Sequence, residues 1–136
     1  MMIFFHHMHY HSFTDVQTVV RTIQNHPNKE LRQRVSLLAA WLKEQSPEPG
    51  ARVASWAAKG ELTCLMPLAA ARAGVVHVPI NPLLKQAQAA YILENSGAVL
   101  LVANKARLGS LEEGDLPQEC AAIEEAEARE AAYAIA

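Results

Sequence analysis

The stretch that decides the fold is RAGVVHVPINPLLKQAQAAYIL, residues 72–93. Gly74 follows a run of helix formers and is suited to end a helix, because glycine enters the left-handed region without a steric penalty. The β-branched run that follows predicts a strand buried on both faces of a parallel sheet, and its members are Val75, Val76, Val78 and Ile80. Pro79 removes a backbone donor at the end of this strand. Asn81-Pro82 predicts a turn, after which a helix over residues 84–95 completes a helix–strand–turn–helix unit.

The same alternation of helices and strands continues before and after residues 72–93. Apolar residues recur with helical spacing over residues 28–45, and their stripe consists of Leu31, Val35, Leu38 and Leu42. Residues 52–58 and 98–103 predict strands, and ELTCLMPLAAARA at 61–73 predicts an apolar helix that Pro67 kinks or shortens. Asn104 is a candidate cap for a last short helix. We therefore expect an α/β fold with an open, mostly parallel sheet and helices on both faces.

The chain divides into three segments by composition. Residues 1–27 form a His-rich segment, either poorly ordered or a short helix, and residues 28–111 carry the α/β pattern. Residues 112–136 predict an acidic, alanine-rich helical tail, helical from residue 119, that has little apolar surface to bury. At 136 residues in total, the chain is the size of one domain with a real core.

Charge and cysteine content exclude several classes of protein. The formal net charge of -2 combines an excess of basic residues before residue 112 with an excess of acidic residues after it. Because the basic residues are scattered over helix faces, the pattern does not indicate nucleic-acid binding. No apolar run reaches the length of a membrane span, and the N-terminus lacks the basic start of a signal peptide, so we expect a cytoplasmic protein. Cys64 and Cys120 have no ligand or redox spacing and predict two reduced cysteines.

Few side chains are candidates for chemistry. The cluster His6, His7, His9 and His11 is either an opportunistic metal site or a solvated tail, and no cysteine or carboxylate nearby completes a zinc set. His77 alternates with valines, which favours a core or interface histidine over a catalytic one. We expect Tyr91 to pack on the sheet, Trp41 and Trp56 to anchor the core, and Cys64 to be a small buried apolar residue. Neither G-x-G-x-x-G nor G-x-x-x-x-G-K-[ST] occurs in the chain.

The order of motifs from residue 31 to residue 111 resembles the opening of the AMP-forming acyl-CoA synthetases. The motifs are LLAAWLKEQ, a Pro-Gly turn leading to RV, RAGVVHVPINPLL, YILENSGAVLLV and a helix that starts near NKARL. Within the family, NPLLKxxQxxYIL is most similar to the acyl-CoA ligases associated with exosortase A systems. The chain departs from the family at Ala51, where the usual residue is aspartate, and at Ala58-Lys59-Gly60, where a Pro-Asn turn is usual.

The resemblance implies carboxylate activation by ATP and Mg²⁺, followed by thioester formation with coenzyme A. The phosphate-binding loop of the family, TSGTTGxPKG, lies downstream of the matched region, as does the catalytic lysine, and neither occurs in this sequence. The matched residues Gly74, Pro79, Asn81 and Pro82 shape the backbone. We therefore assign no catalytic, cofactor-binding or metal-binding residue.

Two hypotheses for function follow. The first is the N-terminal part of such a ligase, inactive as this chain alone. The second is a non-catalytic α/β interaction module derived from the ligase fold. The expected partner is the remainder of a ligase or a second copy, joined through apolar surface that we expect to be exposed around residues 61–71.

Overall fold

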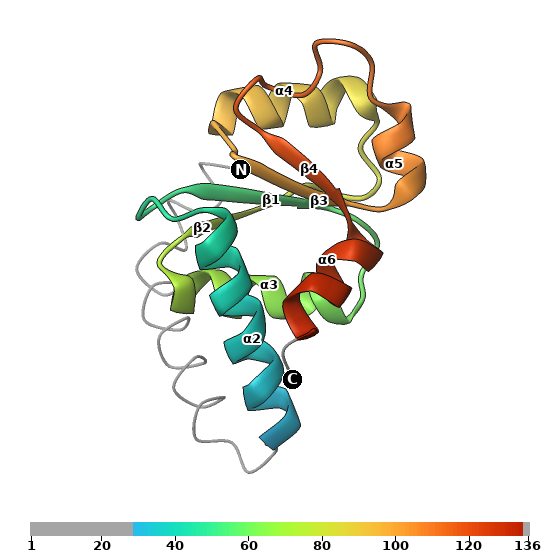
Figure 1. The fold of residues 1–136 in the computed structure, drawn as a ribbon. Coiled ribbons are helices and arrows are strands. Elements are labelled where there is room, and N and C mark those ends of the chain that lie inside the picture. Colours follow the sequence, from blue (N-terminus) through green and yellow to red (C-terminus); the bar gives the residue numbers. More distant parts are fainter. Residues whose placement is uncertain (1–28, 135–136) are drawn as a thin grey trace, which may run out of the picture.

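The computed structural model describes residues 29–134, and these form alternating helices and strands around one sheet (Figure 1). In chain order the elements are α2 (Lys29–Gln45), β1 (Arg52–Trp56), α3 (Glu61–Ala73), β2 (Val76–Pro79), α4 (Gln86–Ser96), β3 (Leu100–Ala103), α5 (Lys105–Ser110), β4 (Ala121–Glu124) and α6 (Glu125–Tyr133). The division of the chain at residues 27 and 111 stays a prediction.

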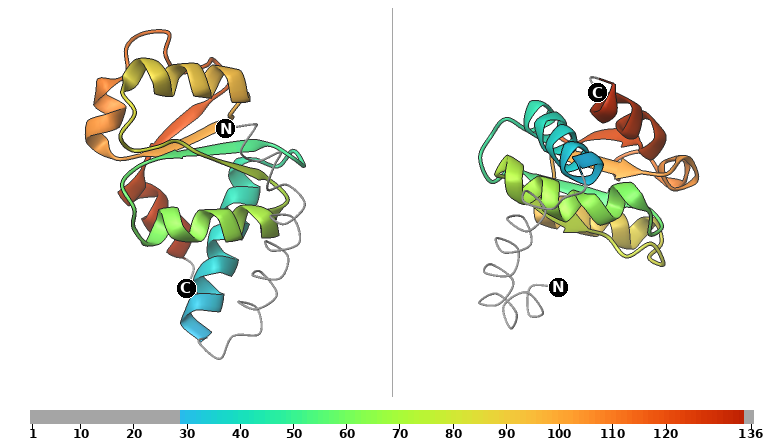
Figure 2. Two further views of the ribbon diagram at one scale, coloured as in Figure 1. Left: turned by 180° about the vertical axis from the view of Figure 1, so that it is seen from behind. Right: turned by 90° about the horizontal axis from the view of Figure 1, so that it is seen from below.

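The sheet has four strands in the order β2-β1-β3-β4, and every neighbouring pair is parallel. Helices α2, α3 and α6 cover one face, and α4 and α5 cover the other (Figure 1). Figure 2 shows α2 between α3 and α6 on their shared face. The prediction of an open parallel α/β sheet with helices on both faces is confirmed.

Helix α2 follows the predicted apolar stripe. Val35, Leu38 and Leu42 are at most 1% exposed, and Trp41 joins them in the core. These side chains pack on α3 and α6, so burial of the stripe, rather than helix propensity, holds α2 in place.

Helix α3 runs without interruption through Pro67, so of the two predicted effects the shortening is wrong, and the kink stays a prediction. It ends at Gly74, whose φ of 77° is the predicted left-handed cap. Its apolar side is covered by α2 and the sheet, and its buried residues are Leu62, Leu65, Met66, Ala69 and Ala70. The expected exposure of apolar surface around residues 61–71 is therefore wrong for these five residues.

Strand β2 lies at the edge of the sheet, so only part of it is buried. Val76 is 50% exposed, which contradicts the prediction of a strand buried on both faces. The backbone N–H groups of Val76 and Ile80 donate to the carbonyl oxygens of Ala51, just before β1, and Ser55 on β1, so the alternate residue Pro79 faces the open edge without a donor. The proline thus protects an edge that would otherwise accept another strand.

The turn and helix after β2 form as predicted, with one exception. The side chain of Asn81 accepts a hydrogen bond from the backbone N–H of Leu83 at 2.9 Å, which makes the expected Asn-Pro turn. Asn104 caps α5 by accepting from the backbone N–H of Arg107 at 2.8 Å. Tyr91, however, is 69% exposed on α4, so the prediction that it packs on the sheet is wrong.

The tail differs most from its prediction. Residues 121–124 form strand β4 instead of helix, because they pair with β3 and thereby satisfy backbone groups on that side. Helix α6 follows and buries Ala128 and Ala132 to 0% and 2% exposure against the core of α2 and α3. The expectation of a tail with little to bury is wrong, because small alanine side chains let α6 approach the core closely.

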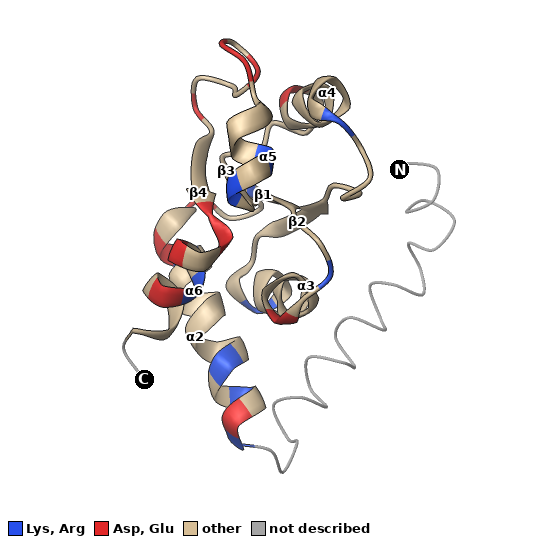
Figure 3. Ribbon diagram, turned by 90° about the vertical axis from the view of Figure 1, so that its right-hand side faces the viewer, with Lys and Arg blue, Asp and Glu red and all other residues tan. Residues whose placement is uncertain are grey.

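Charged residues collect on this last segment. Acidic residues lie along α6 and on the loop before β4 (Figure 3). On the side of α6 that faces α2, the guanidinium of Arg34 lies 5.1 Å from the centre of the Tyr133 ring and pairs with Glu61. Through these two contacts, Arg34 of α2 connects this helix to both α3 and α6.

Among residues 29–134, no helix has the length and apolar character needed to cross a membrane. Both cysteines are free, but Cys64 is exposed, so the prediction that it is buried is wrong, whereas Cys120 is buried. Trp41 and Trp56 are buried as predicted.

Candidate functional site

Parallel pairing brings two polar side chains together where β1 and β2 end. Val53 on β1 lies beside His77 on β2, and Ser55 lies beside Pro79. Because alternate residues of a strand point to the same face, Ser55 and His77 both point to the face that α3 covers. The carboxyl ends of strands are also where open α/β sheets bind their ligands.

Ser55 and His77 share a hydrogen bond. Their Oγ and Nε2 atoms are 2.8 Å apart, and Ser55 is only 4% exposed. Burial lowers the pKa of His77 to about 4, so its imidazole is neutral at physiological pH. His77 was predicted to be a core or interface histidine, and the structure places it half-buried on the edge strand β2.

The pair does not form a hydrolytic dyad. A catalytic base needs a pKa near the operating pH, and a serine nucleophile has to reach its substrate. The lowering of the His77 pKa to about 4 by burial works against the first condition, the 4% exposure of Ser55 works against the second, and within residues 29–134 no carboxylate is bonded to His77. The hydrogen bond between Ser55 and His77 can instead hold the neutral imidazole of His77 in one orientation.

Ser55 and His77 both line an open cavity of about 460 Å³. The loop between β1 and α3 contributes Lys59 to its lining, α3 contributes Thr63 and Cys64, and the loop after β2 contributes Asn81. No acidic residue lines the cavity in the part of the chain that the structure describes.

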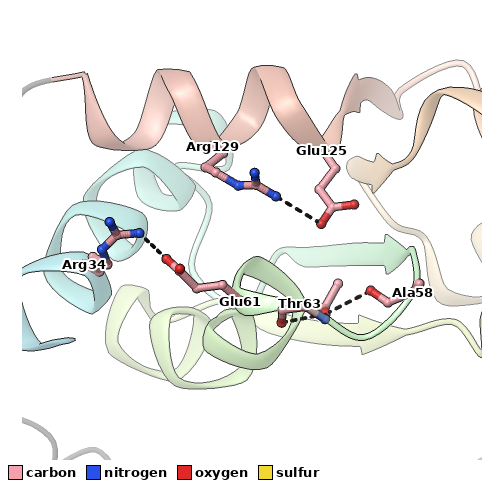
Figure 4. Close-up of polar contacts among 7 residues, drawn as sticks. Arg34, Ala58, Glu61, Thr63, Glu125 and Arg129 are labelled. Atoms are coloured by element: carbon pink, nitrogen blue, oxygen red, sulfur yellow. Dashed lines mark hydrogen bonds and ion pairs between the residues drawn. The ribbon is translucent and has the colours of Figure 1, made fainter.

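The beginning of α3 is held in place by its own polar contacts (Figure 4). Thr63 Oγ1 accepts a hydrogen bond from the backbone N–H of Gly60 at 2.9 Å and lies 3.4 Å from the carbonyl oxygen of Ala58. On the same side of the sheet, Glu61 pairs with Arg34, and Glu125 pairs with Arg129 at 3.6 Å. Both carboxylates are thus engaged by arginine.

A second open depression, of about 720 Å³, lies at the ends of β1 and β3. The chain order of the strands reverses between these two strands, which is the usual ligand-binding position of a doubly wound sheet. Arg107 lines it and donates to the carbonyl oxygen of Pro82 at 3.0 Å, and Gln86 bonds to Asp115 at 2.5 Å. These polar groups already have partners within the protein.

Metal ligation has no support among the described residues, where no group of three or more His, Cys, Asp or Glu side chains is placed to hold an ion. The predicted cluster His6, His7, His9 and His11 lies outside these residues. The absence of an assigned catalytic, cofactor-binding or metal-binding residue therefore stays a prediction.

Sequence reasoning identified His77 but missed Ser55. A signal was available, because Ser55 stands between two apolar residues, Ala54 and Trp56, in a predicted strand, and a buried hydroxyl group needs a hydrogen-bond partner. Periodicity alone did not reveal that the partner was 22 residues away.

Comparison with known proteins gives both a family and a fold. The model of the family described as AMP-binding enzyme matches residues 11–135. No curated protein sequence matches the chain.

Among solved structures, the N-terminal subdomain of Klebsiella oxytoca NpsA superposes with a TM-score of 0.63 at 22% identity, over 75% of this chain and 25% of that one. A benzoate CoA ligase from Burkholderia xenovorans LB400 gives 0.63 at 24% identity, over 73% and 22%. The O-succinylbenzoate coenzyme A synthetase MenE from Bacillus subtilis, in complex with AMP, gives 0.59 at 20% identity, over 71% and 24%. The chain thus has the fold of one part of these proteins and spans about a quarter of their length.

Proposed function

The chain belongs to the AMP-binding enzyme family, and from this premise we propose that it is the N-terminal part of an AMP-forming acyl-CoA ligase. The complete enzyme would join a carboxylate to the α-phosphate of ATP and release pyrophosphate. The thiol of coenzyme A would then attack the acyl carbon and displace AMP, which leaves a thioester. A cytoplasmic location is part of the proposal, because both ATP and coenzyme A are consumed.

The observation that carries this proposal is the family match over residues 11–135, which covers most of the chain. The fold supports it, because the chain superposes on the N-terminal subdomain of NpsA, on a benzoate CoA ligase and on an O-succinylbenzoate coenzyme A synthetase. The motif NPLLKxxQxxYIL, which includes the Asn81-Pro82 turn, supports an acyl-CoA ligase of the exosortase A-associated branch.

The residues present do not fit the phosphates of ATP or its Mg²⁺. The sequence has no Gly/Ser/Thr-rich phosphate loop, and residues 29–134 contain no cluster of acidic ligands. We therefore propose that this chain does not adenylate a substrate on its own. In the complete ligase, this chain would form the N-terminal sheet and the turns of its backbone. Its partner would be the remainder of the ligase.

The first test is to sequence the DNA that follows the codon for Ala136. We expect a reading frame that encodes a TSGTTG-type loop. The absence of such a frame would favour the alternative, a non-catalytic α/β interaction module.

The second test is ATP–pyrophosphate exchange with a panel of carboxylic acids. The 136-residue chain should give no exchange above buffer, whereas the product of the extended frame should exchange and then form a thioester with coenzyme A. Exchange by the 136-residue chain would refute its inactivity. Transfer of the acyl group only to a carrier protein would refute the acyl-CoA assignment.

A further inference from the structure

The cavity beside Ser55 and His77 has a chemistry that the family match does not explain. Ser55 Oγ has one hydrogen-bond partner among the described residues, His77 Nε2. Ser55 is 4% exposed and lines the open cavity, and His77 Nε2 is the one acceptor that the described residues offer to its hydroxyl hydrogen, so donation to this nitrogen pairs that hydrogen within the protein. In that arrangement Nε2 is the acceptor, and the proton of the neutral ring resides on Nδ1.

In this tautomer the Nδ1–H group of His77 is a donor that has no hydrogen-bond partner among residues 29–134. No residue of the described part accepts from it, and it is not among the buried polar atoms that lack a partner, so it reaches solvent. His77 also lines the open cavity. With Ser55 as the donor, the ring keeps the Nδ1–H tautomer and presents this N–H group as a hydrogen-bond donor.

The rest of the lining favours a ligand with acceptor oxygens. The exposed ammonium group of Lys59 and the amide NH₂ of Asn81 add donors, since the oxygen of Asn81 is already used by the backbone of Leu83. No carboxylate of the described residues lines the cavity to oppose an anion. Pro79 and Ile80 supply apolar wall, and about 460 Å³ is enough space for a small molecule.

We propose that this cavity binds a small oxyanion, held by the Nδ1–H of His77 and the ammonium group of Lys59, with Ser55 setting the tautomer. The shared chemistry is that of a carboxylate or a phosphate. The site goes beyond the proposed function, because it uses side chains of this chain alone and its test requires neither ATP nor coenzyme A.

The tautomer is tested by long-range ¹H–¹⁵N correlation spectra of the histidine rings at pH 7, with the His77 signals identified by their loss in His77→Gln. We expect the Nδ1–H pattern in the natural chain. In Ser55→Ala we expect a shift toward the mixed or Nε2–H pattern of a free imidazole. An Nε2–H tautomer in the natural chain would overturn the proposal.

Binding is tested in the same spectra by titration with sodium butyrate and, separately, with inorganic phosphate, at an ionic strength held constant with sodium chloride. We expect a saturable shift of the His77 nitrogens with at least one probe, and the tighter probe identifies the ligand class. Lys59→Met should weaken that binding at least fivefold. Lys43→Met removes an exposed lysine of α2 outside the cavity and should leave it unchanged.

Two results would overturn the proposed site. One is a shift that does not saturate with either probe and equals the shift produced by chloride. The other is equal binding by Lys59→Met and Lys43→Met. Because both variants lose one positive charge, a merely long-range effect of net charge would affect them alike.

Discussion

Acidification from pH 7.5 to pH 5 should lower the free energy of unfolding by about 2 kcal/mol through His77 alone. In the folded protein, burial lowers the pKa of His77 to about 4, from 6.5 for an unperturbed histidine. Between these two values the unfolded chain binds a proton that the folded chain does not. The contribution of His77 to stability is therefore complete above pH 6.5 and is lost as the pH falls toward 4.

The magnitude follows from the width of this window. Each pH unit below 6.5 removes about 1.4 kcal/mol, so 1.5 units remove about 2 kcal/mol and the whole window removes about 3 kcal/mol. The effect is large for a domain of this size, whose stability is roughly 5–15 kcal/mol.

The assay is urea unfolding at several pH values, followed by the fluorescence of the buried residues Trp41 and Trp56. His77→Gln is the matched variant, because glutamine keeps a polar group that can bond Ser55 but does not titrate. The other histidines and all carboxylates are common to both proteins, so their effects cancel in the difference. We expect the natural chain to lose about 2 kcal/mol more than the variant between pH 7.5 and pH 5. Parallel loss in the two proteins would refute the reasoning.

Three further predictions concern packing, capping and reactivity. Ala128→Leu, which adds bulk where α6 is fully buried, should lower the free energy of unfolding by about 1–3 kcal/mol, whereas Ala126→Leu on the exposed side should change it by less than about 0.5 kcal/mol. Equal effects in urea unfolding would show that α6 does not dock as described. Asn104→Ala should cost about 1 kcal/mol in the same measurement, because α5 loses its side-chain cap, and an unchanged midpoint would contradict that role. The exposed thiol of Cys64 should react with a chromogenic disulfide reagent in the folded protein. Cys120, which is 5% exposed and whose pKa burial raises to about 11, should react only after unfolding, and two equally fast thiols would be inconsistent with the fold.

The local pattern of residue types along the chain was sufficient to predict much of the fold. The spacing of Val35, Leu38 and Leu42 correctly predicted both α2 and its buried face, because helical periodicity is a property of neighbouring residues. The left-handed cap at Gly74 and the cap at Asn104 were also predicted from single residues and their neighbours, since each satisfies backbone groups within a few positions. Proline and β-branched residues likewise located β2 and the turn after it.

The candidate site was predicted only in part. A histidine among valines indicated that His77 is unusual, but its hydrogen bond to Ser55 depends on the register of β1 and β2. A shift of one residue would have turned the two side chains to opposite faces. Local sequence does not specify this register, because the pairing joins residues that are separated by a whole helix.

Residues 72–93 alone were enough to indicate a helix, a strand, a turn and a second helix in an α/β sheet, because steric limits on glycine, proline and β-branched residues act locally. Tertiary contacts decided what lay beside each element. Residues 121–124, although alanine-rich and helix-prone, became strand β4 because the edge of β3 offered them backbone partners along one side. Val76 and Tyr91 remained exposed because β2 lies at the edge of the sheet and Tyr91 lies on the outer side of α4. Periodicity predicts which residues share a face, but whether that face is covered depends on the elements that pack against it.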